Sequence, residues 1–478
     1  MVWLVASPAL AAYLAYTHFA GADKTLLMPG ELSPGHHQLA ESCDSCHLQG
    51  FGGGEVLQEA CIDCHGETRV KPFDSHPRSK FSDPRNADRL EKINAVECVT
   101  CHLEHRPEIT QKDGLTQPRD LCFHCHAGIG EDRPSHRDMP FDTCKDSGCH
   151  NFHDNRALYT DFLVRHMDAP PIAARPRVPG REFAEVVEEI MEYPRDHYPV
   201  EPLDAADKDV PPDVGFSPEL ERQWLETAHA RAGVNCSACH QQRDEQGELG
   251  PWNDHPGAEG CTACHGLEVR RFQQGKHGMR LAAGLAPMTP AQARLPMQPM
   301  PIRAPFATNT PVRARPAMQQ IAAHEELGCV SCHGAHDFDV TRAAVEGCLQ
   351  CHADEHSLAY EDSPHHRLWQ AEVAGEGKPN SGVSCATCHM PRIDFDVNEW
   401  MSRTMVDHNQ SANLSPNSKM IRPACIHCHG LGFALDALAD ETLIRRNFNG
   451  EPTVHVRSID LARADQERYQ RELEAARQ

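Results

Sequence analysis

Cysteine and histidine recur in this chain in one fixed arrangement. The sequence reads Cys-x-x-Cys-His ten times and the longer Cys-x-x-x-x-Cys-His once. Two thiols followed directly by an imidazole can add to the two vinyl groups of a haem while the imidazole binds its iron from one face. The motifs are Cys43/Cys46/His47, Cys61/Cys64/His65, Cys98/Cys101/His102, Cys122/Cys125/His126, Cys144/Cys149/His150, Cys236/Cys239/His240, Cys261/Cys264/His265, Cys329/Cys332/His333, Cys348/Cys351/His352, Cys385/Cys388/His389 and Cys425/Cys428/His429.

These motifs use every cysteine, because eleven pairs make 22 and the chain contains 22. No thiol is left for a disulfide, a zinc site or a nucleophile. Zinc sites also use Cys-x-x-Cys, but they do not require a histidine directly after each second cysteine. A thioredoxin-like redox pair predicts one such motif rather than a string of them. We therefore predict eleven covalent haem c groups.

The composition indicates a fold built around these groups. Aromatic residues make up only 6% of the 478 residues, which is lean for an ordinary hydrophobic core of this size. Burial of flat porphyrin faces would supply the missing hydrophobic drive. We predict a mainly α multihaem cytochrome c with much irregular loop, a core formed by packed haems, and little or no sheet.

The net charge narrows the choice of partners. The chain has 46 Lys and Arg residues against 69 Asp and Glu residues, a formal charge of −23. Such acidity argues against a nucleic-acid partner. It suits other redox proteins with cationic patches, acting as electron donor and acceptor, although it could also serve solubility alone.

The first residues are strongly apolar. Residues 2–20 are about as long as a bilayer span, although Pro8 and His18 interrupt them. We interpret residues 1–22 as an export signal or a membrane anchor. Haem c is attached outside the cytoplasm in bacteria, so we expect a periplasmic or extracellular location, and the apolar segment could anchor the protein to the inner membrane.

The motifs fall into two blocks separated by a haem-free stretch rich in Pro and Asp. Such composition is typical of a linker. The charged end of the chain is helix-prone, with charge pairs four residues apart. We predict an N-terminal segment (1–22), a pentahaem domain (23–166), a Pro-rich linker (167–223), a hexahaem domain (224–443) and a helical tail (444–478).

Histidine is present in excess. Of 32 histidines, eleven belong to the motifs, which leaves 21, or nearly two per haem. This surplus favours irons with a histidine on both faces and low potentials, rather than Met ligation. Besides the four discussed next, the candidates for the second ligand are His36, His37, His76, His136, His166, His229, His255, His277, His324, His365, His366 and His408.

Four further histidines lie three or four residues after a motif histidine: His105, His153, His336 and His356. Each must lie on the same side of its own haem as the motif histidine, so it cannot reach the opposite face of that iron. It can reach a neighbouring haem. We therefore expect these four to ligate haems other than those of the adjacent motifs; surface or propionate contacts are the alternative.

The two blocks resemble different families. The first, with CHLEHRPEIT at 101–110 and the expanded Cys144 motif, resembles small class III cytochromes c, which are bis-His electron carriers. The second resembles the octahaem hydroxylamine oxidoreductase and pentahaem nitrite reductase superfamily. It does so through HARAGVNCSACH at 229–240, CTACHGLEVRRFQQGKHGM at 261–279, CLQCHADEHSLAYEDSPHHRLW at 348–369 and GVSCATCHMPR at 382–392.

The second resemblance implies a reactive haem. By motif order it would be the haem of Cys261, Cys264 and His265, with His365 or His366 lining its open face and Tyr360 as a proton donor. A histidine can supply charge and a proton near neutral pH, and a phenol can donate a hydrogen bond. The alternative is that one of the two histidines closes an iron and Tyr360 packs on a porphyrin. The chain has no Cys-x-x-Cys-Lys, which the typical nitrite reductase carries.

Three functions remain open at this point. The first is electron transfer along a chain of mostly bis-His haems. The second is reduction of a small nitrogen or sulfur oxyanion at one open iron. The third is a subunit of an extracellular haem filament, a homo-oligomer in which haem stacking continues between chains. The coordination of the irons separates the first two, because a catalyst needs an open or weakly bound face.

The motif count can be tested on the intact protein. Mass spectrometry should show eleven haem additions to the processed chain, and thiol titration should find no free cysteine. Ten additions would mean that the Cys144 motif is idle, and several free thiols would contradict the assignment of every cysteine.

Overall fold

The computed structural model describes most of the chain. It covers residues 2–19, 24–47, 54–69, 76, 81, 83–111, 113–144, 152–153, 160–180, 201–241, 247–294, 326–398, 401–414 and 417–477. Three predicted site residues, Cys149, His150 and His324, lie outside the described residues, as does the middle of the predicted linker.

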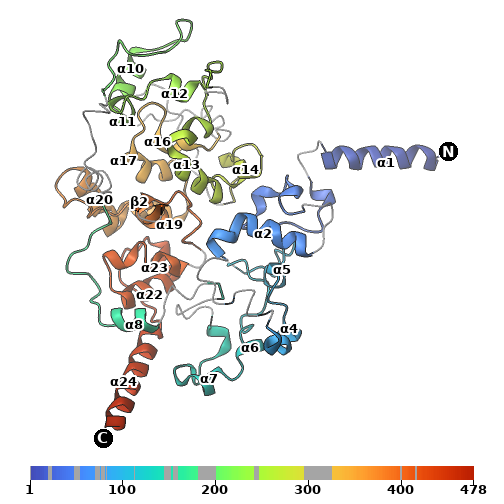
Figure 1. Cartoon of the computed structure of the whole chain (residues 1–478), viewed down its shortest axis with the longest axis vertical. Helices are drawn as coiled ribbons and strands as arrows, with labels where there is room; N and C mark the ends of the chain where they lie inside the picture. Colours follow the sequence, from blue (N-terminus) through green and yellow to red (C-terminus); the bar gives the residue numbers. More distant parts are fainter. Residues whose placement is uncertain are drawn as a thin grey trace.

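Short helices joined by irregular segments make up the first block of the chain (Figure 1). Its helices are α1 (Val2–Phe19), α2 (Gly54–Arg69), α4 (Ala87–Lys92), α5 (Cys98–Cys101), α6 (Phe123–His126), α7 (Ile129–Asp132) and α8 (Thr160–His166). Single 3₁₀ turns lie between them, among them η2 (His37–Leu39), η3 (Cys43–Ser45) and η5 (Pro134–His136).

The second block has the same character. Its helices are α10 (Pro218–Leu225), α11 (Ala228–Arg231), α12 (Ser237–His240), α13 (Glu259–Gln274), α14 (Met279–Ala282), α16 (Cys329–His333), α17 (Val340–Ala344), α18 (Glu346–Leu349), α19 (Glu355–Leu358), α20 (Pro364–Val373), α21 (Cys385–His389), α22 (Leu431–Ala439), α23 (Glu441–Arg445) and α24 (Ser458–Arg477). The prediction of a mainly α fold with much loop and little sheet is confirmed.

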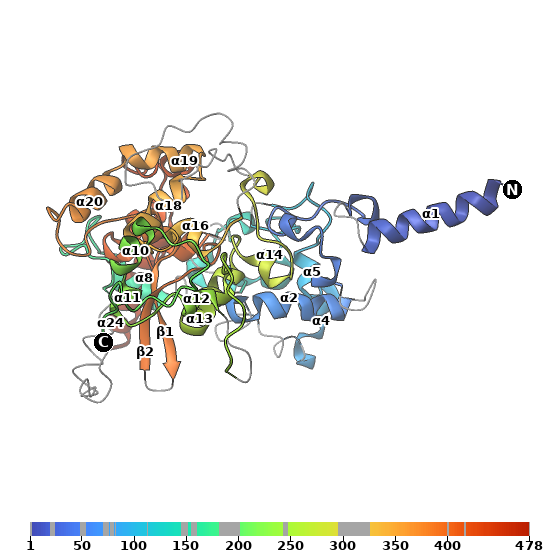
Figure 2. The same ribbon diagram turned by 90° about the horizontal axis from the view of Figure 1, so that it is seen from above.

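One antiparallel hairpin forms the sheet of the described residues. Strand β1 (Arg392–Asn398) pairs with β2 (Met401–Val406), from Arg392 opposite Val406 at the open end (Figure 2). In β1 the apolar Ile393, Phe395 and Val397 alternate with polar residues, the period that a half-buried strand requires. The hairpin begins just after the motif that ends at His389 and leads back to His408.

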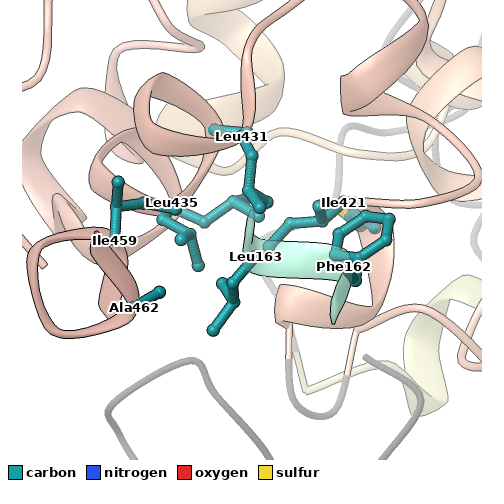
Figure 3. Close-up of a cluster of buried hydrophobic side chains, with 10 residues drawn as sticks. Phe162, Leu163, Ile421, Leu431, Leu435, Ile459 and Ala462 are labelled. Carbon is teal, nitrogen blue, oxygen red and sulfur yellow. The ribbon is translucent and has the colours of Figure 1, made fainter. Parts of the chain in front are cut away.

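A cluster of apolar side chains packs at the C-terminal end of the molecule (Figure 3). Leu431 and Leu435 of α22 contact Phe162 and Leu163 of α8 together with Ile421, which is fully buried. The first turn of α24 adds Ile459 and Ala462. Helix α8, which we placed in the pentahaem domain, therefore packs in the core of the second block.

A buried arginine joins the two blocks. Arg280, whose side chain is 5% exposed, donates to the Gln38 carbonyl at 2.8 Å and pairs with Glu41 at 3.0 Å. The Gln38 amide donates to the Lys276 carbonyl at 3.0 Å, and the Lys276 ammonium donates to the Pro34 carbonyl at 2.9 Å. These polar contacts place η2 against the start of α14.

The described parts of the predicted linker lie along the second block. Ile172 forms an isolated antiparallel bridge with His429, and the Val178 amide donates to the Asn380 carbonyl at 2.8 Å. Farther along, the Leu203 amide donates to the Ala230 carbonyl at 2.9 Å. These segments thus make backbone contacts at His429 and at Ala230, the residue after His229.

Helix α1 projects from the body of the molecule, with Trp3 and Val5 exposed (Figures 1 and 2). Among the described helices, none combines the length and the apolar character that crossing a membrane requires. At the other end of the chain, α24 (Ser458–Arg477) is helical and buries Ser458, Ile459 and Ala462.

The apolar cluster offers a stability test. The Leu435→Ala variant should lose about 2–5 kcal/mol of unfolding free energy, because it leaves a cavity among well-packed side chains. Denaturant unfolding followed by far-ultraviolet circular dichroism measures this. The matched Leu249→Ala variant, at a leucine that is 46% exposed, should change the free energy by less than about 0.5 kcal/mol. Equal losses in the two variants would contradict the packing described here.

Candidate haem-binding sites

Each described Cys-x-x-Cys-His motif adopts a compact turn. In six of the motifs the histidine amide donates to the carbonyl of the first cysteine, an α-helical hydrogen bond. The donor–acceptor pairs are His47–Cys43, His102–Cys98, His126–Cys122, His240–Cys236, His352–Cys348 and His429–Cys425, at 2.8–3.0 Å. The turn places the two thiols and the imidazole on neighbouring positions of one surface. No described cysteine forms a disulfide, which is what haem attachment requires.

Two of the predicted haem cysteines, Cys125 and Cys351, are placed by this backbone turn. The Cys125 amide donates to the Cys122 carbonyl at 3.3 Å, and the Cys351 amide donates to the Cys348 carbonyl at 3.1 Å. Both residues are half-buried. The turn thus holds each second cysteine next to its motif histidine, as attachment to a vinyl group requires. We predict a thioether bond to haem at each of these two cysteines. The count of haem additions by mass spectrometry tests this prediction.

A second histidine ring faces the motif histidine in all ten Cys-x-x-Cys-His motifs. The ring centres are 5.8 Å apart in His36–His65 and His240–His336, 6.0 Å in His229–His265 and His356–His389, 6.1 Å in His76–His126 and His277–His352, 6.2 Å in His102–His153 and His365–His429, 6.3 Å in His333–His408 and 6.5 Å in His47–His105.

This spacing fits a metal ion between two imidazoles. A metal–imidazole bond is about 2 Å long, and adding the distance from nitrogen to ring centre on both sides gives roughly 6 Å between centres. Directly packed aromatic rings span a similar range, so the recurrence of this spacing at all ten motif histidines is the feature that indicates a shared kind of site. The donor set also suits haem, since each facing pair includes the histidine that follows two cysteines outside any disulfide.

The four histidines that follow a motif closely all face a histidine of another motif. His105 faces His47 and His153 faces His102. His336 likewise faces His240, and His356 faces His389. Each such segment thus carries one imidazole for its own motif and one for a different motif.

Two of these histidines have a left-handed backbone, with φ of 59° at His105 and 69° at His336. This conformation costs a residue other than glycine about 1–2 kcal/mol. It places an irregular turn of the backbone three residues after the adjacent motif histidine. Strain of this kind persists only where the surroundings impose it.

Backbone carbonyls orient many of the paired rings through Nδ1, which leaves Nε2 as the nitrogen available to a ligand; in His356, Nε2 also lies 3.3 Å from Asn447 Nδ2. The pairs are His76 with Phe152, His102 with Gly114, His105 with Gly30, His240 with Asn253, His356 with Ile444, His408 with Val406 and His429 with Pro171, at 2.5–3.1 Å. Burial lowers the pKa of His277, His365 and His389 to about 4, so these rings stay neutral, the form that binds metals.

A carboxylate holds one of the facing histidines. His36 Nδ1 lies 2.6 Å from Glu104 Oε1, and Ser33 donates to both oxygens of Glu104 through its amide and its hydroxyl. Burial alone would raise the pKa of Glu104, but these hydrogen bonds and the charge of His36 lower it to about 2. We did not predict a role for Glu104; its position between His102 and His105 was the available signal.

A buried ion pair fixes the segment that carries His408. Arg271 of α13 donates to both oxygens of Asp407, at 2.9 and 2.7 Å, and Asp407 is only 1% exposed. Asp407 also accepts from the Asn409 amide at 3.0 Å. Its neighbour His408 is thereby held opposite His333.

Thiols of several successive motifs interact with one another. A hydrogen bond between Cys61 and Cys98 raises the pKa of the first thiol and lowers that of the second, and Cys261 and Cys329 do the same. Further thiol interactions join Cys122–Cys144, Cys239–Cys261, Cys332–Cys348, Cys348–Cys385 and Cys388–Cys425. In the second block, the motifs follow one another in space in sequence order.

The candidate catalytic residues lie elsewhere than the resemblance implied. The ring that faces His265 is His229, whereas His365 faces His429. Tyr360 is buried and donates from its hydroxyl to the Val383 carbonyl at 2.8 Å. His366 lies beside Tyr360 and bonds through Nδ1 to the Glu361 carbonyl. This arrangement favours the alternative in which His365 closes an iron.

Other predicted ligands have different surroundings. His136 lies against the Ser135 hydroxyl, and His166 packs on the Phe162 ring at 4.4 Å. His37 bonds to the Pro34 carbonyl at 3.0 Å, and His255 is exposed. Within the described residues, His37, His166 and His255 do not belong to the ten pairs given above.

Close packing of Gly30 against His105 gives a prediction. A Cβ at Gly30 would lie 2.5 Å from the His105 carbonyl oxygen, so Gly30→Ala should push His105 away from His47. The reduced protein should then bind carbon monoxide at one further haem, seen by its absorbance change. Gly128→Ala, where a Cβ meets nothing within 4 Å, is the control. Unchanged carbon monoxide binding in Gly30→Ala would contradict the role of His105.

Comparison with known proteins gives one match. Residues 35–127, which hold four of the motifs and three of the facing histidines, match the family model described as cytochrome c3. No curated protein and no solved structure matches the chain. The match to residues 35–127 supports a multihaem electron-transfer cytochrome with covalently bound haem c.

Proposed function

We propose that this chain is an eleven-haem cytochrome that passes electrons along a row of irons held by two histidines each. The observation that carries the proposal is the second imidazole, which faces the motif histidine at 5.8–6.5 Å in all ten Cys-x-x-Cys-His motifs. A pure carrier needs both faces of each iron closed, and such pairs would close them.

The chain's own residues would hold each group in three ways. The two cysteines of a motif would form thioethers, the motif histidine would bind the iron, and the facing histidine would bind it from the other side. Haem iron supplies one-electron chemistry by cycling between its ferric and ferrous states. The carbonyls that accept from Nδ1 keep the rings in place through this change of charge and limit rearrangement.

The row follows the sequence in the second block. Electrostatic interactions between thiols of successive motifs, from Cys239 and Cys261 to Cys388 and Cys425, support proximity of the attached groups. The segments that carry His36 and His277 meet where Gln38 donates to Lys276. We infer that electrons cross between the two blocks at this contact.

Partners and location follow from the same proposal. Multihaem cytochromes of this kind are typically periplasmic or extracellular, and other redox proteins would act as donor and acceptor. The net charge of −23 favours partners with a cationic docking surface. We also propose export through residues 1–22. Assembly of the chain into a filament is a further proposal, which depends on haems exposed at both ends of the molecule.

The reductase alternative receives less support. It rests on the resemblance of the second block and on an open iron at His265. His229 faces His265 at 6.0 Å, which leaves little room for a substrate at that iron. A substrate could bind there only if His229 moved away.

Exposure of the fully reduced protein to candidate substrates tests the function. A carrier with closed irons should stay reduced for minutes in nitrite, hydroxylamine or sulfite, and should bind carbon monoxide at no more than one haem. Rapid oxidation by one of these compounds, at a rate that scales with its concentration, would favour the reductase.

A pair of histidine variants makes the test specific. His336→Ala should open the iron of the Cys236 haem, because His336 faces His240 at 5.8 Å. Carbon monoxide binding should rise by one haem per chain. His255→Ala removes an exposed imidazole and should leave binding unchanged. The same result in both variants would contradict the assigned ligands.

A further inference from the structure

Glu104 reaches from one motif segment to a histidine that serves another. It lies between His102 and His105, yet its Oε1 is 2.6 Å from Nδ1 of His36, whose ring faces His65. Three motifs therefore meet at this residue, those of Cys43, Cys61 and Cys98. The carboxylate cannot rotate away easily, since Oε2 accepts from the Ser33 amide at 2.9 Å and Oε1 from the Ser33 hydroxyl at 2.8 Å.

The acceptor distinguishes His36 from other second-ligand histidines that bond to backbone carbonyls, such as His105 and His408. A charged acceptor forms a hydrogen bond roughly twice as strong as a neutral one. Carboxylates near two motif histidines are farther away, with Glu268 at 4.0 Å from His265 and Asp354 at 3.9 Å from His352. Those distances lie outside direct hydrogen bonding.

We propose that Glu104 lowers the reduction potential of the haem at Cys61, Cys64 and His65 by drawing on the Nδ1 proton of His36. This inference rests on the proposed role of His36 as the second ligand. When the carboxylate pulls on this proton, Nε2 becomes a stronger donor and stabilises the ferric iron. The negative charge of Glu104 acts in the same direction.

The reaction affected is a one-electron transfer. His36 and His65 would hold an iron that accepts one electron from a neighbouring ferrous iron, which would become ferric, and no covalent bond would form or break. The proton stays in the hydrogen bond between His36 and Glu104 throughout. Because Glu104 favours the ferric side, this haem should be among the last to be reduced.

The haem at Cys61 would lie close to the contact between the two blocks. The His36 segment continues into η2, where Gln38 donates to the carbonyl of Lys276, the residue before His277. Arg280 fastens the same two segments through Gln38 and Glu41. A low-potential haem at this contact would pass electrons between the blocks without retaining them. Glu104 would thereby influence electron transfer between the two blocks.

The test compares three variants of the full-length holoprotein by potentiometric titration, together with low-temperature electron paramagnetic resonance. Glu104→Gln keeps an oxygen acceptor but removes the charge. The midpoint potential of one haem at the low-potential end of the titration should rise by about 59 mV. For a one-electron change, this equals about a tenfold increase in the ratio of reduced to oxidised iron at a given potential. One low-spin signal should shift its g values.

A second variant, which should shift the potential in the opposite direction, separates an electronic effect of Glu104 on the haem from a purely structural one. Ser33→Ala removes a donor that competes with His36 for Oε1, so the carboxylate should pull harder and the potential of this haem should fall. If Glu104 only held His36 in place, both substitutions would loosen that contact, and both would move the potential in the same direction. Glu108→Gln is the control, since it removes an equal charge, 59% exposed, from the same segment.

The outcomes distinguish this inference from the function on which it rests. A wild-type protein with many high-spin irons would overturn the proposed ligation itself. A low-spin wild type whose titration and g values are unchanged in Glu104→Gln would overturn only the role of Glu104. Equal shifts in Glu104→Gln and Glu108→Gln would also overturn it, because they would reflect general charge.

Discussion

The distance between two facing imidazoles is the constraint on which the rest of this structure depends. Under the proposed ligation, each pair must keep its ring centres about 6 Å apart to admit one iron. The two rings of a pair come from segments as distant as His277 and His352, or His333 and His408. The chain therefore folds so that loops return histidines to earlier or later motifs. This explains why helices are short and loops are many.

Ordinary packing has a secondary role. The apolar cluster around Leu431 and Leu435 anchors the end of the second block, and the Arg280 contacts join the blocks. The described motif cysteines are half-buried or, at Cys64 and Cys264, exposed, so protein atoms alone do not enclose them. Residues such as Asp407 and Gly30 act through the histidines, by fixing a segment or by permitting close approach.

The sequence predicted a good part of this arrangement, because motif spacing is a local property. It predicted the helical character, the motifs, and, from same-side geometry, that His105 and His336 would turn toward other motifs. It could not assign partners such as His229 to His265, since those depend on the path of the loops. The expectation for His365 came from a resemblance in motif order, and the fold brings that residue to His429 instead. Glu104 escaped notice because a carboxylate beside a histidine is common, and only the tertiary fold shows which ring it meets.

Low-temperature electron paramagnetic resonance of the fully oxidised protein tests the central claim most directly. Spin quantification separates low-spin irons with two nitrogen ligands from high-spin irons with an open face. The account predicts low-spin signals for the haems of all ten Cys-x-x-Cys-His motifs, so at most one iron per chain, that of the Cys144 motif, should be high-spin. Two or more high-spin irons per chain would contradict it.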